Sequence, residues 1–183
     1  MDNPTTLLVA IMFVTILSIG LSNLLMTLSD IVGQKIAVQP DAVHLSWMLL
    51  LFMSYFSYYW ETVAILDIEG WTFLSFIGFL IGPILLLFAT NLTISLPDSE
   101  QSASPREHYL TQSNRFFTMM VGVQAWIIAL DFIFDTVDLA TYGTAAALSI
   151  FAVLIFTNNY KAHVLGNILC WIPFAVRLVA EAT

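Results

Sequence analysis

The chain has 183 residues, of which 59% are hydrophobic and only 10% are charged, and its formal net charge at pH 7 is −8. Soluble globular domains contain about 25% charged residues, so this composition excludes an ordinary soluble domain. The acidic balance argues against a nucleic-acid partner and leaves no polybasic patch for lipid headgroups. Apolar stretches of about 20 residues recur along the chain, which is the length that a helix needs to cross a bilayer. The sequence therefore predicts an all-α, polytopic transmembrane helical bundle.

Six predicted spans follow one another along the chain. They cover, in order, about residues 6–28, 42–66, 71–94, 115–134, 139–157 and 162–180, and the first has room to extend to residue 34. The longest connection, residues 95–114, is polar and is expected to hold at most a short interfacial helix near residues 106–113. It divides one transmembrane domain into two halves of three spans each, residues 1–94 and 115–183.

The basic residues predict the orientation, because Lys and Arg in short loops are retained on the cytoplasmic side. Lys35, Arg106, Arg115 and Lys161 fall in or beside connections on one side of the predicted bundle. The loops on the opposite side carry acidic residues and no basic residue. We therefore expect both chain ends outside the cytoplasm and the 95–114 connection inside it.

Three charged residues fall inside predicted spans, namely Glu61, Asp131 and Arg177. Each comes about 15 residues after the cytoplasmic start of its span, which at about 1.5 Å per residue places all three at a similar depth. Charges at membrane depth usually face the bundle interior and pair. One hypothesis is that Arg177 bridges Glu61 and Asp131. The alternatives are that each side chain extends separately to the headgroups, or that the three serve a substrate or an ion.

Other polar side chains recur at helical spacing within the spans. They are Asn23 and Asp30 in the first span, Gln124 in the fourth, and His163 and Asn167 in the sixth. Inward-facing polar residues can line a conduction pathway. The alternative is that they form hydrogen bonds between packed helices, which is the more common role of such residues.

Each half ends in a span with a proline near its middle, Pro83 in the third span and Pro173 in the sixth. Paired broken helices in inverted halves mark the binding sites of many transporters, although a proline is also tolerated as a simple kink. The histidines have no metal-ligand spacing, and no nucleophile–base pair is recognisable. We therefore expect neither a metal site nor an enzyme.

Two stretches carry a resemblance: GWTFLSFIGFLIGPILLLFATNLTISLP at residues 70–97 and EHYLTQSNRFF at residues 107–117. Together they resemble a family of uncharacterised bacterial multi-pass membrane proteins with a Trp-Thr-Phe start, a mid-helix proline, a Leu-Pro end and then His-Tyr and Arg-Phe-Phe. The resemblance implies a bacterial inner membrane and a layout of three plus three spans. The residues that match the motif of this family are His108, Tyr109, Arg115 and Phe116. For them the resemblance implies an ordered junction of the cytoplasmic loop with the next span. It assigns a catalytic role to no residue.

Two functional hypotheses follow. The first is a channel or transporter for an ion or a small solute that works as an oligomer. The second is a non-catalytic accessory or scaffold subunit of a larger membrane complex, for example one that contains pigments or quinones. The expected partners are the lipid bilayer and either further copies of the chain or other membrane subunits. The sequence names no substrate and no cofactor.

Overall fold

The computed structural model describes residues 4–33, 41–65, 68, 70–94, 105–134 and 136–182, and of these it leaves undescribed the side chains of residues 61, 62, 64, 65, 94, 105, 108 and 176–182. The described part of the chain contains six helices joined by short connections, and it contains no strand. Its helices are α1 (Pro4–Val32), α2 (Ala42–Ile65), α3 (Phe73–Ile94), α4 (Pro105–Ile133), α5 (Leu139–Ile155) and α6 (Tyr160–Ala182). The all-α prediction is confirmed.

Three stretches of the described chain are long and apolar enough to cross a membrane: Pro4–Val32, Phe73–Thr93 and Tyr109–Ile133. They belong to α1, α3 and α4. Helix α5 is also apolar but shorter, and at about 1.5 Å per residue it is about 25 Å long. These helices have the character that a membrane protein requires, whereas the arrangement of six spans stays a prediction.

Helix α4 differs most from its predicted bounds, because it begins at Pro105 rather than near residue 115. The polar composition of residues 106–114 suggested a loop with a short separate helix. No glycine or proline interrupts the chain between Pro105 and Gly122, so the helix continues without a break. Pro105 suits the first helical position, where its missing N–H is not needed, and Glu107 in the first turn is favoured by the helix dipole.

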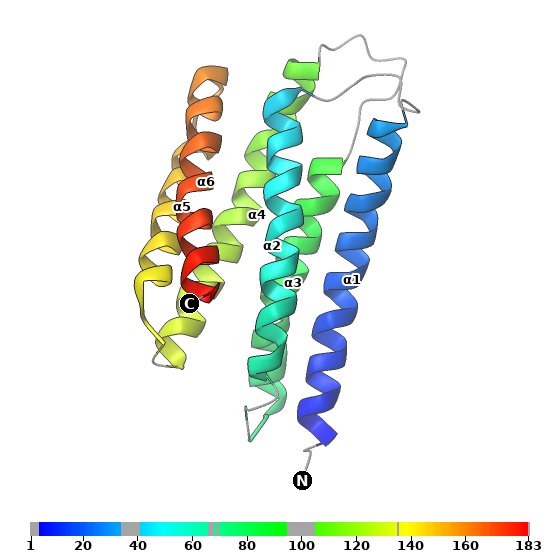
Figure 1. The fold of residues 1–183 in the computed structure, drawn as a ribbon, viewed down its shortest axis with the longest axis vertical. Coiled ribbons are helices and arrows are strands. Elements are labelled where there is room, and N and C mark those ends of the chain that lie inside the picture. The colour runs from blue at the N-terminus through cyan, green and yellow to red at the C-terminus, as the bar shows by residue number, and fades with distance from the viewer. Residues whose placement is uncertain are drawn as a thin grey trace.

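The helices run alternately up and down (Figure 1). We call the end where α2, α4 and α6 begin the upper end, and the opposite end the lower end. Helices α1, α3, α4 and α5 pack side by side in that order, while α2 packs mainly on α1 and α6 packs mainly on α5. Arg106, Arg115 and Lys161 belong to segments at the upper end, and Asp138 lies at the lower end.

Tyr55 locks the first three helices together. Its ring is fully buried, and a Cβ at Gly20 of α1 would clash with its phenol group. Its hydroxyl lies 2.8 Å from Thr90 Oγ1 of α3. Because Thr90 donates its own hydrogen to the Leu86 carbonyl, Tyr55 is the donor in this pair. A glycine on α1, a tyrosine on α2 and a threonine on α3 thus form one contact through the first half.

Helix α3 continues through Pro83, and α6 continues through Pro173. Both prolines are therefore accommodated within continuous helices, which is the alternative that the sequence left open beside broken helices. Pro83 leaves the carbonyl of Phe79, four residues before it, without its usual partner, and the neighbouring Gly78 carbonyl accepts a hydrogen bond from the Trp126 indole of α4 at 2.9 Å. Gly82 makes room for this indole, since a Cβ there would clash with the ring. A neighbouring helix thus supports the backbone around the proline, as occurs in membrane bundles.

The two halves are packed differently. In the first half α1 contacts both α2 and α3, whereas in the second half α5 contacts both α4 and α6. Few contacts join α4 and α6 within the described residues. An inverted repeat would match α1 with α4 and would therefore require α4 to contact both of its partners. The packing thus gives no support to an inverted repeat.

Candidate functional site

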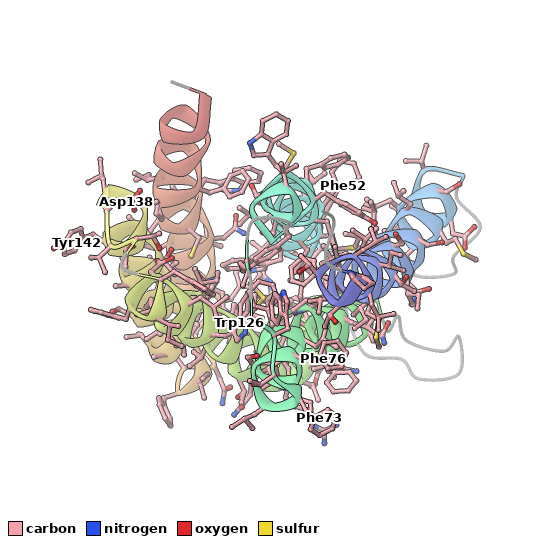
Figure 2. All side chains as sticks on the ribbon, turned by 90° about the horizontal axis from the view of Figure 1, so that it is seen from below. Phe52, Phe73, Phe76, Trp126, Asp138 and Tyr142 are labelled. Carbon is pink, nitrogen blue, oxygen red and sulfur yellow. The ribbon has the colours of Figure 1, made fainter. Side chains whose placement is uncertain are left out.

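A cleft of about 80 Å³ lies between α2, α4, α5 and α6. This volume is enough for several water molecules. Viewed from the lower end, α2 lies apart from α5, and Trp126 lies near the centre of the bundle (Figure 2). Most of the lining is apolar or aromatic and includes Trp47, Leu51, Met120, Phe151 and Pro173. The lining therefore has the apolar character of small-molecule sites, although such sites usually have larger volumes of about 300–1,000 Å³.

Polar groups also reach the cleft, and two of them have no partner. Ser57 on α2 is 7% exposed, and its hydroxyl makes no hydrogen bond. The carboxamide of Gln124 on α4, which also lines the cleft, is not hydrogen-bonded within the described residues. Ser54 and Thr144 donate to backbone carbonyls of their own helices at 2.9 and 3.0 Å and keep lone pairs free to accept. A buried hydroxyl without a partner costs about 1–3 kcal/mol, so Ser57 would gain from a bound molecule.

Small residues on α5 shape the other wall of the cleft. Ala140, Gly143, Thr144 and Ala147 all line it. Gly143 faces Pro173 of α6, and a Cβ at Gly143 would make an ordinary contact at 3.4 Å from Cβ of Pro173. Small residues at such spacing permit close helix contacts in membranes. On α5 they serve two purposes, because they seat α6 and leave space in front of α2.

Aromatic rings close the cleft at its upper end. The indole of Trp47 on α2 packs at centroid distances of 6.0 Å from Phe116, 5.2 Å from Phe117 and 5.7 Å from Phe151. The Phe117 ring in turn lies 5.4 Å from the imidazole of His163 on α6. All five side chains are buried. We call these five residues, with Tyr109, the upper seal.

A chain of hydrogen bonds runs through the upper seal. Trp47 Nε1 donates to the Tyr109 hydroxyl at 3.0 Å, and this hydroxyl lies 2.9 Å from His163 Nδ1. His163 Nε2 lies 2.8 Å from the Thr157 carbonyl, which can only accept. The imidazole therefore carries its hydrogen on Nε2, and Nδ1 accepts from Tyr109. Every polar atom of this buried chain has a partner with the correct role.

A second set of hydrogen bonds joins α2 to α6 directly. Ser46 donates to Asn167 Oδ1 at 2.7 Å, and the Trp171 indole donates to Ser46 Oγ at 3.0 Å. The Nδ2 group of Asn167 is buried and has no partner. Helices α2 and α6 are thus tied near the upper end, whereas the cleft separates α2 from α5 below it.

Tyr160 and Asp41 cap the upper end above the seal. The Tyr160 hydroxyl donates to Asp41 Oδ1 at 2.7 Å, and the Arg106 guanidinium lies 3.9 Å from the centroid of the Tyr160 ring. Burial, and then the donation to the Asp41 carboxylate, raise the pKa of Tyr160. The cap links the start of α2 to the starts of α4 and α6.

Comparison of the chain with protein-family models, with curated proteins and with solved structures gave no match. The argument for function therefore rests on the geometry. Of the residues that carry the resemblance to bacterial multi-pass proteins, Tyr109 and Phe116 belong to the upper seal and Arg115 is exposed. The side chain of His108 lies outside the described residues.

The predicted polar pathway is divided between separate places. Gln124 lines the cleft, while His163 and Asn167 belong to the hydrogen-bonded upper end. Asn23 instead donates to Asn91 Oδ1 at 3.2 Å across α1 and α3. Asp30 is half-buried in the last turns of α1. The structure thus brings Gln124, His163 and Asn167 to the same side of the bundle and places Asn23 elsewhere.

The predicted charge cluster stays a prediction, because the side chains of Glu61 and Arg177 lie outside the described residues. Asp131 has a described partner, since Thr141 Oγ1 donates to its Oδ2 at 2.7 Å. Thr141 and Asp138 also form a capping box at the start of α5. Asp131 therefore has a local role in fixing the turn between α4 and α5.

The histidines do not form a metal site within the described chain, which contains no group of three or more His, Cys, Asp or Glu residues that could hold an ion. His44 Nε2 lies 2.6 Å from the Thr93 carbonyl and joins α2 to α3. Sequence reasoning missed the roles of Trp47 and Tyr109. A signal was available, because a buried indole N–H or phenol usually requires a hydrogen-bond partner.

Proposed function

We propose that the chain is a six-span membrane protein that binds a small amphipathic solute in the cleft and carries it across the bilayer. The packing supports six spans, because α2, α5 and α6 enclose the cleft together with α4 and run alongside the membrane-spanning stretches. Helix α5 is shorter than the roughly 30 Å hydrocarbon core. Local thinning of the bilayer accommodates such a helix at a modest cost.

The observation that carries this proposal is a mostly apolar cleft with a buried Ser57 hydroxyl and the Gln124 carboxamide on its wall, for which the described residues supply no hydrogen-bond partner. An apolar lining with a few polar groups is typical of small-molecule sites. A solute with an apolar body and a hydrogen-bonding group fits this chemistry. Its polar group also makes unassisted passage through the bilayer costly, which gives a carrier a purpose.

The upper seal favours a carrier over a continuously open channel. Buried aromatic rings and satisfied hydrogen bonds close the cleft at one end, so a solute can pass only if α2 and α6 separate there. The bonds of Ser46 with Asn167 and Trp171 are the contacts that must break. Motion of this kind is how alternating access works in many transporters.

Photolabelling tests the site directly. The probe is an eight-carbon alcohol that carries a photoreactive diazirine, and mass spectrometry locates its adducts on the purified protein. We expect adducts on cleft residues of α2, α4, α5 and α6. Ala147→Phe fills the cleft and should abolish them, whereas Ala146→Phe alters an exposed position on the same helix and should not. Adducts confined to exposed residues, or adducts that persist in Ala147→Phe, would contradict the proposal.

Ser57→Ala provides a second test with opposite effects on binding and stability. Loss of the hydroxyl should weaken binding of the alcohol by about fivefold, because one net hydrogen bond is worth about 1 kcal/mol. The empty protein should unfold at the same or a higher temperature, since the variant removes a buried group that has no partner. Lower stability together with unchanged binding would show that Ser57 serves the fold and not the site.

A further inference from the structure

A second hollow lies on the opposite side of α4 from the cleft. It is an open groove of about 510 Å³ between the end of α3 and the upper part of α4. Phe88, Leu92 and Met119 give it an apolar floor, and Asn114 and Arg115 supply polar groups. The proposed function makes no use of this groove.

Arg115 is the feature that gives the groove a chemical preference. Three cations have described side chains, Arg106, Arg115 and Lys161. Arg106 packs over the Tyr160 ring, and Lys161 is exposed and does not line the groove. Arg115 is exposed, and no carboxylate pairs with it among the described residues. An exposed guanidinium group without a carboxylate partner is well suited to a phosphate group, which it can bind through two parallel hydrogen bonds.

The height of the groove fits a lipid headgroup. Asn91, which also lines it, is two residues from the end of the apolar stretch Phe73–Thr93, and Arg115 is six residues inside Tyr109–Ile133. At about 1.5 Å per residue, Arg115 lies about 9 Å from the upper end of the stretch Tyr109–Ile133, on its membrane side. A long side chain at this depth reaches the headgroup level while its stem stays in the apolar layer.

The apolar side chains point to a lipid and not to a free anion. Phe88 is 51% exposed on the outer face of α3, and Met119 lies one helical turn from Arg115 along α4. A phosphate held by Arg115 and Asn114 would therefore have an acyl chain beside these two side chains. Basic pockets between membrane helices bind anionic lipid headgroups in this way.

We propose that the groove between α3 and α4 binds an anionic phospholipid, with Arg115 and Asn114 on the phosphate and an acyl chain along Phe88 and Met119. The site does not depend on the cleft, so either can fail without the other. It is also distinct from a polybasic patch, because one arginine in a shaped groove supplies the charge.

Native mass spectrometry of the delipidated full-length protein tests the site. The probes are phosphatidylglycerol and phosphatidylcholine with identical acyl chains, added in equal amounts. Both lipids carry the phosphate, but the choline cation of phosphatidylcholine offsets its charge and is repelled by Arg115, so we expect the protein to prefer phosphatidylglycerol about tenfold. Arg115→Gln should remove this preference and Lys161→Gln should keep it. Arg115→Lys retains the positive charge but cannot form two parallel hydrogen bonds, so it should keep part of the preference. This variant keeps the test informative even if Arg115→Gln does not fold.

Three results would overturn the proposal. The first is an equal preference in the wild-type protein and Arg115→Gln. The second is an equal loss in Arg115→Gln and Lys161→Gln, which would indicate general attraction to charge. The third is displacement of the lipid by glycerol phosphate at equal concentration, which would identify the groove as a site for a free anion.

Discussion

Replacing Tyr109 with Phe removes a single hydroxyl from the upper seal and should destabilise the protein strongly. That hydroxyl accepts from Trp47 Nε1 and donates to His163 Nδ1, and all three residues are at most 4% exposed. The variant leaves one buried donor and one buried acceptor without partners. At about 1–3 kcal/mol for each of the two unsatisfied groups, the expected cost is roughly 2–6 kcal/mol.

The assay is thermal unfolding of the purified protein in detergent, followed by circular dichroism. For a chain of this size each kcal/mol shifts the midpoint by about 2–4 °C, so the expected decrease is roughly 4–24 °C. Tyr142→Phe is the matched control, because Tyr142 is 69% exposed on α5, and it should change the midpoint little.

A double-mutant cycle isolates the contact between the indole and the phenol. In a Trp47→Phe background the indole donor is already absent, so Tyr109→Phe should cost less than it does in the wild-type protein. Residues in one hydrogen-bond network show coupling energies of about 0.5–3 kcal/mol. If Tyr109→Phe matched Tyr142→Phe, or if the two seal variants were additive, the hydrogen-bond chain through the seal would be refuted.

Two further predictions concern helix contacts. Gly82→Ala should lower the unfolding temperature, because the added methyl would clash with Trp126 and overpacking costs about 1–3 kcal/mol. Gly78→Ala should be neutral or stabilising, because a Cβ there meets nothing within 4 Å. If Gly78→Ala destabilised the protein more than Gly82→Ala, the contact between α3 and α4 would be wrongly described. Thr141→Val should cost about 1–2 kcal/mol, because the hydroxyl no longer accepts from the Asp138 backbone N–H or donates to Asp131, although Asp138 still caps the helix. Thr141→Ser should retain most of the stability in the same unfolding assay.

Local sequence patterns predicted the helices well. The bounds of α2, α3, α5 and α6 differ from their predicted positions by at most two residues, because apolar runs and turn residues determine where each helix starts and stops. The prediction failed at the start of α4. There polar residues such as Arg106 and Asn114 were interpreted as a loop, although polarity alone does not stop a helix that lacks glycine and proline.

The cleft and the upper seal were beyond local patterns. Tyr109 is 62 residues from Trp47 and 54 from His163, and helical spacing says nothing about pairs so far apart. The cleft exists because α2 packs on α1 and does not pack on α5. This packing depends on how side chains fit together, for example Tyr55 against Gly20. In a membrane helix the lipid-facing side is as apolar as the packed side, so hydrophobic periodicity did not distinguish the two.

The central claim is that the protein contains a cleft which admits small molecules, and Cys170 tests it most directly. It is the only cysteine of the chain, it is buried, and it lines the cleft. The measurement is the rate at which N-phenylmaleimide modifies this thiol in native membranes. The account predicts slow modification that octanol suppresses and Ala147→Phe prevents, with Ala146→Phe behaving as wild type. The account would be contradicted if the thiol never reacted, or if neither octanol nor Ala147→Phe changed the rate of modification.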